Sequence, residues 1–112
     1  MTLVLSFYDI ETNSYSLGPV LPVMQWTEEA EVIHRANDTL MGLGASVWSN
    51  DVEQANRIAR KLQAGSVWVN AHLEMSLNTT FGGHKHSGIG VEHSVHGLKA
   101  YTNMQSLYLK KR

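Results

Sequence analysis

Histidine is the residue type whose spacing first suggests chemistry in this sequence. Six histidines occur, and four of them, His84, His86, His93 and His96, fall between residues 84 and 96. Pairs at i, i+2 and i, i+3 could in principle gather a metal ion. However, the first pair lies in a glycine-rich stretch without defined geometry, and no carboxylate or thiolate clearly accompanies the second pair. We therefore predict loop or surface histidines and no metal site.

No nucleophile or acid–base pair stands out among the other residues. The chain has no cysteine, which excludes a thiolate nucleophile and thiolate metal ligands. Glu74 is isolated, and Glu92 stands where a helix begins and where a negative charge is favourable. Trp48 and Trp68 lie in apolar runs without interleaved basic residues, which favours core packing over stacking on bases. The residues alone predict no catalytic group.

The stretch from Thr80 to Glu92 carries four of the nine glycines. Glycine at this density marks a turning backbone or a close approach to a neighbouring segment. A P-loop requires Lys-Ser or Lys-Thr directly after its last glycine, but Ile89-Gly90 follows Gly88, and the G-x-G-x-x-G pattern is absent. The spacing therefore predicts no phosphate site. A tight connection between packed elements is the favoured interpretation, with a functional loop as the alternative.

Length and composition indicate one small domain or a piece of a larger one. The chain has 112 residues, 43% of them hydrophobic and 17% charged, which is typical of a packed globular segment. A net charge of −1 gives no argument for binding nucleic acid or an anionic membrane. No apolar run approaches the roughly 18 residues of a membrane span, and no signal peptide is evident. We expect a soluble, cytoplasmic chain.

Apolar periodicity predicts an α/β fold, in which a parallel βαβαβ unit is followed by a glycine-rich loop, a C-terminal helix and a terminal strand. Thr27 and Asp51 are expected to cap two helices at their N-termini, with Gln54 completing a capping box, and Gly65 is expected at C′ after the second helix. The second helix should bury one face, formed by Val52, Ala55, Ile58, Ala59 and Leu62. Strands are expected over residues 2–9, 20–26, 44–49, 66–70 and 105–109, and helices over 27–38, 51–64 and 92–101.

A family resemblance enters with the glycine-rich stretch. Phe81-Gly82-Gly83-His84-Lys85-His86-Ser87-Gly88-Ile89-Gly90 resembles the F-G-G-x-K-x-S-G-x-G signature near the C-terminus of aldehyde dehydrogenases. Gly18-Pro19-Val20-Leu21-Pro22-Val23 is similar to the family's E-x-F-G-P-V-x-P-V. The likeness also covers Gly42–Asn50, Ala64–Asn70 and Gly97–Thr102. It spans about Leu17 to Lys110, and several ordered motifs at compatible spacing make it specific.

The resemblance implies that residues 1–112 form a single segment, the C-terminal part of an aldehyde dehydrogenase-like fold. In this family the cysteine nucleophile, the glutamate base, the asparagine oxyanion donor and the nicotinamide-binding half are all encoded upstream of the matched region. Because the chain has no cysteine, we assign it no catalytic residue. The resemblance implies NAD(P) as the family's cofactor, with no cofactor bound by this chain alone.

The resemblance assigns roles at two positions, and the chain departs from the family at two others. Phe81 matches the phenylalanine of the family's substrate tunnel, and Met75, in the loop before it, occupies a tunnel-facing position. Tyr15 and Leu17 stand where the family has the glutamate that grips the nicotinamide ribose and the phenylalanine that follows it. Cofactor-binding residues are therefore left unassigned. We expect Phe81 and Met75 to face a common cavity or groove.

Two functions remain open. The first is the C-terminal portion of an NAD(P)-dependent aldehyde dehydrogenase-like oxidoreductase, which contributes a substrate-tunnel loop and an oligomerisation strand but is not catalytic alone. Such a chain, as a truncated product or a completing subunit, would form homo-oligomers or mixed oligomers with a full-length relative, and would meet an aldehyde only in an assembled site. The alternative is a non-catalytic α/β interaction module that pairs through exposed edge strands. Nucleic acid and membrane are not expected partners of either.

Overall fold

The computed structural model describes residues 2–4, 8–9, 14–15 and 23–111, with side chains from Val23 onward. The sheet at its centre joins three strands in the order β1-β5-β6. Strand β5 (Gly44–Trp48) runs parallel to β6 (Ser66–Val69), and helix α2 (Val52–Ala59) crosses between them. Strand β1 (Thr2–Val4) pairs with the other edge of β5 in the antiparallel direction. The α/β class and the strands expected over 44–49 and 66–70 are confirmed.

The first strand of the expected parallel unit is corrected by the structure. Residues 23–26 of the predicted strand 20–26 are not in a strand, and residues 20–22 lie outside the described part of the chain. Antiparallel β1 occupies the edge of β5 where a further parallel strand would pair, so the described sheet contains one parallel βαβ unit. The strand expected over 2–9 is seen as β1 and β2 (Tyr8–Asp9), while residues 5–7 lie outside the description.

Two short strand pairs and a helix complete the body of the molecule. Strand β2 pairs with β3 (Ser14–Tyr15), and β4 (Met41–Gly42) pairs with β7 (His84–Lys85), both antiparallel. Helix α1 (Glu29–Asn37) precedes β4. Helix α1 starts after Glu28, whose side chain makes no capping bond, so the prediction of Thr27 as the cap is wrong. Two acidic residues in the first turn of α1 still stabilise the helix, because their negative charge lies at its positive end.

Helix α2 follows its sequence pattern closely. Asp51 caps it, because the Gln54 amide donates to the Asp51 carboxylate at 3.0 Å. The reciprocal half of the capping box is replaced by a bond from the Asp51 amide to Ser49 Oγ. Ala55 and Ile58 are fully buried as expected and form the core with Val47, whereas Val52, in the first turn, is half exposed. The helix ends at Ala59 with Arg60 as its C-cap, so Gly65 is not its C′ residue.

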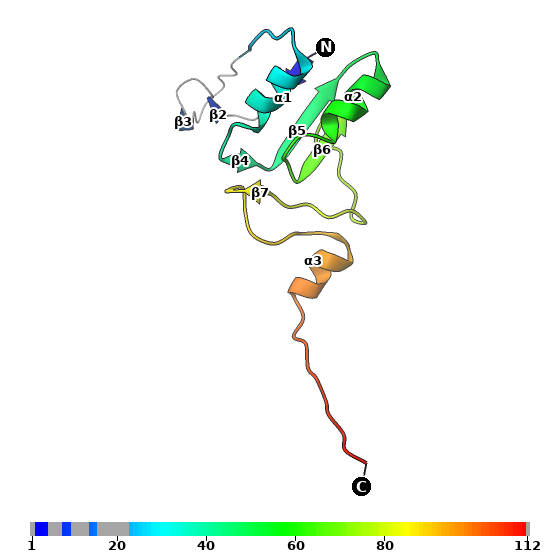
Figure 1. The fold of residues 1–112 in the computed structure, drawn as a ribbon. Coiled ribbons are helices and arrows are strands. Elements are labelled where there is room, and N and C mark those ends of the chain that lie inside the picture. Colours follow the sequence, from blue (N-terminus) through cyan, green and yellow to red (C-terminus); the bar gives the residue numbers. More distant parts are fainter. Residues whose placement is uncertain (1, 5–7, 10–13, 16–22, 112) are drawn as a thin grey trace.

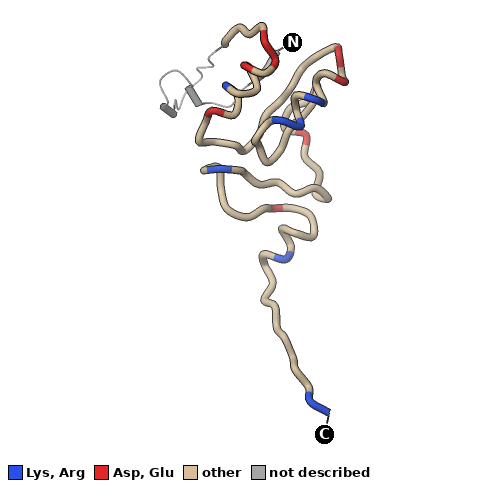
Figure 2. The backbone as a smooth tube through the Cα atoms, viewed as in Figure 1, with Lys and Arg blue, Asp and Glu red and all other residues tan. Residues whose placement is uncertain are grey.

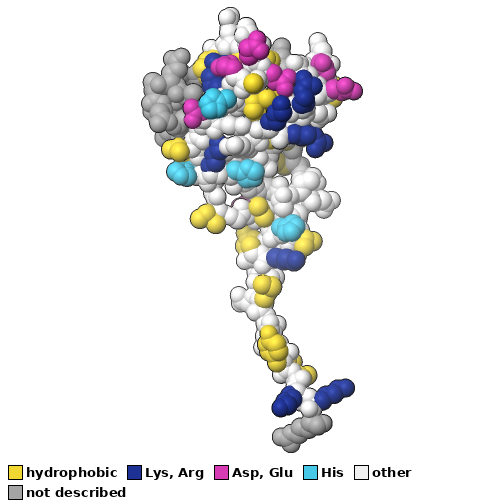
Figure 3. All heavy atoms as spheres, viewed as in Figure 1, with side chains coloured by type: hydrophobic (Ala, Val, Ile, Leu, Met, Phe, Trp, Pro, Cys, Tyr) yellow, Lys and Arg dark blue, Asp and Glu magenta, His cyan; other side chains and the backbone are white. Residues whose placement is uncertain are grey.

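Residues beyond α3 (Ser94–Ala100) form an extended arm rather than a strand. Helix α3 confirms the expected C-terminal helix. Residues 103–111 contain no helix or strand and run away from the body (Figure 1). The strand expected over 105–109 is therefore not formed, because an alternating sequence becomes a strand only beside a partner, and none lies there in the described chain. Between Lys99 and Lys110 the arm carries no charged side chain (Figure 2), and its apolar side chains are exposed (Figure 3).

Candidate functional site: the glycine-rich loop

The glycine-rich stretch is a loop closed at its base. The Phe81 amide donates to the Glu92 carbonyl at 3.0 Å, and the Glu92 amide donates to the Phe81 carbonyl at 2.7 Å. Between these residues the backbone turns through positive φ at Gly88 (143°) and Gly90 (82°), where a side chain would be strained. The predicted tight connection is thus present in the structure.

The loop is fastened along the segment that joins α1 to β5. Strand β7 pairs with β4, and the His86 amide donates to the Leu40 carbonyl at 2.9 Å. Ser87 Oγ accepts a hydrogen bond from the Gly42 amide at 2.8 Å. The serine of the signature is therefore hydrogen-bonded to the protein's own backbone.

Lys85 has the same kind of role at the end of α1. Its ammonium group donates to the carbonyl oxygens of Asn37 (2.6 Å) and Thr39 (3.0 Å). Carbonyls at a helix C-terminus lack partners within the helix and carry partial negative charge, so a cation stabilises them. Lys85 itself has a φ of 53°, which its two-sided attachment maintains.

Two glycines allow close backbone contacts, one between the loop and the start of β6 and one within the loop. A Cβ on Gly65 would overlap the carbonyl oxygen of Gly82, and a Cβ on Gly82 would lie 2.7 Å from the Gly90 carbonyl oxygen. Gly65 is therefore required by close approach of two backbones rather than by a helix terminus. We call Phe81–Glu92, with its attachments to residues 37–42 and to Gly65, the signature clasp.

The predicted tunnel residues lie beside this clasp. Phe81 is half-buried at the base of the loop, with its ring centroid 6.4 Å from that of His93. Met75 is more than half exposed, in the loop that leads from β6 to the clasp. No cavity shared by the two side chains is established by the described contacts, so a common groove stays a prediction.

The predicted cofactor region falls largely outside the described residues. Tyr15 lies in β3 opposite Tyr8, and its side chain is not described, while Leu17 lies outside the described residues. A cofactor role for this region therefore stays untested.

The histidines are dispersed over the clasp and α3. His84 and His86 are exposed in the loop, and His93 precedes α3, with a buried Nδ1 that has no partner within the described residues. Across the described ranges, no three histidine or acidic side chains gather as a metal site would require. None of the helices described is both long and apolar enough to cross a membrane.

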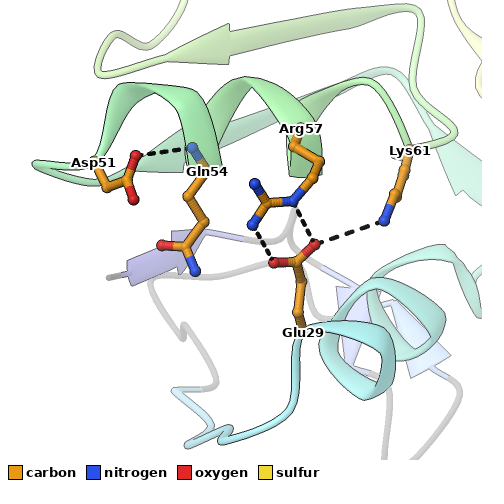
Figure 4. Close-up of polar contacts among 5 residues, drawn as sticks. All are labelled: Glu29, Asp51, Gln54, Arg57 and Lys61. Atoms are coloured by element: carbon orange, nitrogen blue, oxygen red, sulfur yellow. Dashed lines mark hydrogen bonds and ion pairs between the residues drawn. The ribbon is translucent and has the colours of Figure 1, made fainter.

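An ion-pair cluster that the sequence did not reveal joins the two helices of the body. Arg57 on α2 donates to both carboxylate oxygens of Glu29 on α1, at 3.2 and 2.8 Å, and Lys61 lies 3.6 Å from the same carboxylate (Figure 4). The hydrogen bonds from Arg57 lower the pKa of Glu29, and those to Glu29 raise the pKa of Arg57. The partners are 28 residues apart, so no local pattern could have indicated them.

Comparison with known proteins decides the family. The family model described as "Aldehyde dehydrogenase family" matches residues 14–107. The chain belongs to the aldehyde dehydrogenase family. It is 50% identical over 93 residues to 2-aminomuconic semialdehyde dehydrogenase of Danio rerio, and 46% identical over 92 residues to phenylacetaldehyde dehydrogenase of Pseudomonas fluorescens. These matches cover 83% and 82% of this chain but only 19% and 18% of the relatives, so the chain spans about a fifth of their length.

Solved aldehyde dehydrogenases share the fold of this segment. Indole-3-acetaldehyde dehydrogenase from P. syringae, a mutant in complex with NAD+ and IAA, matches with a TM-score of 0.75 and 42% identity, over 84% of this chain and 19% of that one. Betaine aldehyde dehydrogenase from Staphylococcus aureus, in complex with NAD+, matches with a TM-score of 0.72 and 42% identity, over 75% of this chain and 17% of that one. The structure is thus a partial aldehyde dehydrogenase domain.

Proposed function

We propose that the chain is the C-terminal portion of an NAD(P)-dependent aldehyde dehydrogenase-like oxidoreductase. In this role it contributes a substrate-tunnel loop and an oligomerisation strand, and it is not catalytic alone. The observation that carries the proposal is the use of the signature's polar groups. Lys85 and Ser87 bind the protein's own backbone, so these two groups hold the loop and are not free for a chemical step.

Lys85 and the His86 and Ser87 amides of the glycine-rich loop are engaged within the chain, so they are not available to hold a nicotinamide dinucleotide. A phosphate cradle needs free backbone amides and a free lysine, whereas the His86 and Ser87 amides donate to carbonyls within the chain and Lys85 caps α1. NAD+ is bound in the solved structures of the relatives from P. syringae and S. aureus. In an assembled enzyme, the cofactor would then be held by other segments, while this chain would supply the surface near Met75 and Phe81.

Activity measurements test the catalytic part of the proposal. The pure chain is expected to produce no NAD(P)H from any aldehyde, because it lacks the thiol nucleophile. Mixed with a relative from which the corresponding segment has been deleted, it is expected to restore aldehyde-dependent NAD(P)H production. Saturable activity of the chain by itself would overturn the proposal. Stable association without activity would instead support the alternative of a non-catalytic interaction module.

The arm carries the association part of the proposal. Leu107 and Leu109 are 78% and 85% exposed, on a segment that makes no strand hydrogen bonds within the described chain. We expect the arm to pair with a strand of a second copy or of a full-length relative. Leu107→Lys should then weaken association in analytical ultracentrifugation, with helix content unchanged. Ser106→Lys, which adds the same charge at a neighbouring polar position, is the matched control. Equal association of the two variants would contradict this part of the proposal.

A further inference from the structure

The loop from Asn70 to Leu77 connects β6 to the signature clasp and carries Met75. It is attached to the rest of the body at both ends. Asn70 Nδ2 donates to the Ser49 carbonyl at 2.9 Å, and the Ser49 amide donates to Asn70 Oδ1 at 2.8 Å. At the other end, the Ser94 amide donates to the Leu77 carbonyl at 2.8 Å. The conformation between these ends is set by a smaller group of contacts.

A hydrogen bond between a serine and a histidine lies at the centre of that group. Ser46 is 1% exposed in the middle of β5, and its Oγ lies 2.7 Å from His72 Nδ1. The His72 ring meets the Trp68 ring edge-on at a centroid distance of 5.7 Å. Trp68 in turn donates its indole N–H to the Glu74 carbonyl at 2.7 Å. The side chain of His72 and the carbonyl of Glu74 are therefore both fixed to the sheet.

The residue between these two attachments has a strained backbone. Leu73 has a φ of 56°, in the left-handed region that non-glycine residues rarely adopt, and its side chain is 59% exposed. Since the exposed side chain gains little from this conformation, the attachments of His72 and Glu74 must hold it. Loss of either attachment would let Leu73 relax and would displace Met75, two residues later.

We propose that His72 is a positioning residue. Its hydrogen bond to Ser46, together with its contact with Trp68, fixes the 70–77 loop and thereby the place of Met75. The polar partner of His72 is buried and the histidine is exposed, so the bond joins the outside of the loop to the interior of the sheet. The effect of this loop on aldehyde binding rests on the proposed function, whereas the positioning of the loop by His72 does not.

The indole N–H of Trp68 reports the state of the loop in the full chain. The chain has three tryptophans, so three indole signals are expected in a 1H–15N correlation spectrum, and Trp68→Phe identifies the relevant one. His72→Phe keeps a ring beside Trp68 but removes the hydrogen bond. It is expected to shift the Trp68 indole signal and to speed its hydrogen exchange by about five- to tenfold. Ser46→Ala should have the same effect.

A conservative variant separates positioning from general packing. The amide of Asn can donate to or accept from the Ser46 hydroxyl, so His72→Asn should restore slow indole exchange. His34→Phe, at an exposed histidine of α1 with no side-chain bond in the described chain, is the matched control and should leave the signal unchanged. Circular dichroism checks that each variant folds. If Ser46→Ala does not fold, the exposed variant His72→Phe still tests the hydrogen bond. The proposal would be overturned if the Trp68 indole of His72→Phe exchanged at the wild-type rate, or if His72→Asn did not restore slow exchange.

The assembled enzyme tests the consequence for substrate. There, His72→Phe is expected to raise KM for the aldehyde about five- to tenfold with kcat nearly unchanged, because the loop would contact substrate rather than reacting atoms. An unchanged KM in a variant with fast indole exchange would contradict the substrate role of the loop. If the wild-type mixture has no activity at all, the proposed function fails, and the indole measurement still decides whether His72 positions the loop.

Discussion

Residues 29–70 and residues 71–111 are both rich in apolar side chains, yet the two stretches use them differently. Val47, Ala55 and Ile58 are fully buried in the first stretch, whereas Leu77, Met104 and Leu109 are 77%, 98% and 85% exposed in the second. The first stretch contains a complete βαβ unit, which covers one face of its own strands. The second stretch contains short elements that are attached to the first but form no apolar core within the described chain.

This difference separates a stretch that buries apolar side chains in its own core from one that leaves them exposed. Exposed apolar side chains of this kind support the association proposed above. In the second stretch it lies on the loop with Met75, on α3 and along the arm. The comparison predicts that changes inside the first stretch act on stability, that changes in the contacts between the stretches act on the clasp, and that changes in the arm act on association.

The largest effect is expected from a cavity in the first stretch. Ile58→Ala removes a fully buried side chain from the centre of the core and should lower the free energy of unfolding by about 2–5 kcal/mol. Denaturant unfolding followed by circular dichroism measures this loss. Val52→Ala, on the same helix but half exposed, should cost far less. Equal losses would mean that Ile58 is not the centre of the core.

A methyl group at Gly65 should break the contact between the two stretches. The new Cβ would overlap the Gly82 carbonyl oxygen, and relief requires backbone movement, at a cost of about 1–3 kcal/mol. Amide hydrogen exchange should accelerate in residues 81–92 and stay slow in β5 and β6. Gln63→Ala, two residues earlier and exposed, is the control. Uniform acceleration over both stretches would contradict their separate behaviour.

Lys85→Met should loosen the clasp with a smaller loss. Methionine keeps the length of the side chain but removes both hydrogen bonds to the end of α1, which are worth about 1 kcal/mol at this exposed site. Exchange of the His86 amide, which donates to Leu40, should accelerate. Lys99→Met on α3, where no side-chain bond is described, is the matched control. An unchanged His86 amide would show that strand pairing alone holds the loop.

The smallest effect is expected from the ion-pair cluster on the surface of the first stretch. The lowered pKa of Glu29 means that the cluster stabilises the fold above the ordinary pKa of a glutamate, and that this contribution is lost as the pH falls through the lowered value. Glu29→Gln should therefore slightly lower the melting temperature near neutral pH and make no difference in strong acid. Glu74→Gln, in the second stretch, should leave the melting temperature unchanged at every pH. A difference between wild type and Glu29→Gln that persists in strong acid would exclude this ionic cause.

Local patterns predicted the first stretch well. The spacing of Ala55 and Ile58 and the cap at Asp51 depend on neighbours along one helix, and the structure confirms them. Thr27 failed as a cap, because α1 begins one residue later than expected, after Glu28, whose side chain makes no capping bond. The role of Gly65 was wrongly assigned to a helix terminus, because the glycine is required by its close contact with Gly82, which is distant in the sequence.

The candidate site was less accessible to sequence reasoning. The family and the signature loop were identified from ordered motifs, and the family is confirmed. Phe81 and Met75 came from resemblance alone and stay predictions. Ser46 and His72, 26 residues apart, carry no joint signal in the sequence, and the contacts of Lys85 cross 46 to 48 residues. The strand expected over 105–109 alternates correctly, but alternation cannot supply a neighbouring strand.

The register of the short β4–β7 pair has a consequence for the order of folding. Met41 pairs with Lys85, whereas Gly44 pairs with Ser66, which is half the sequence separation. Closing the longer loop costs more chain entropy and is rewarded by only two residue pairs, so β5, α2 and β6 should assemble first. Strand β7 and Lys85 would then join β4 and the end of α1 after the β5-α2-β6 unit has formed, so the second stretch would fold last, against an existing sheet.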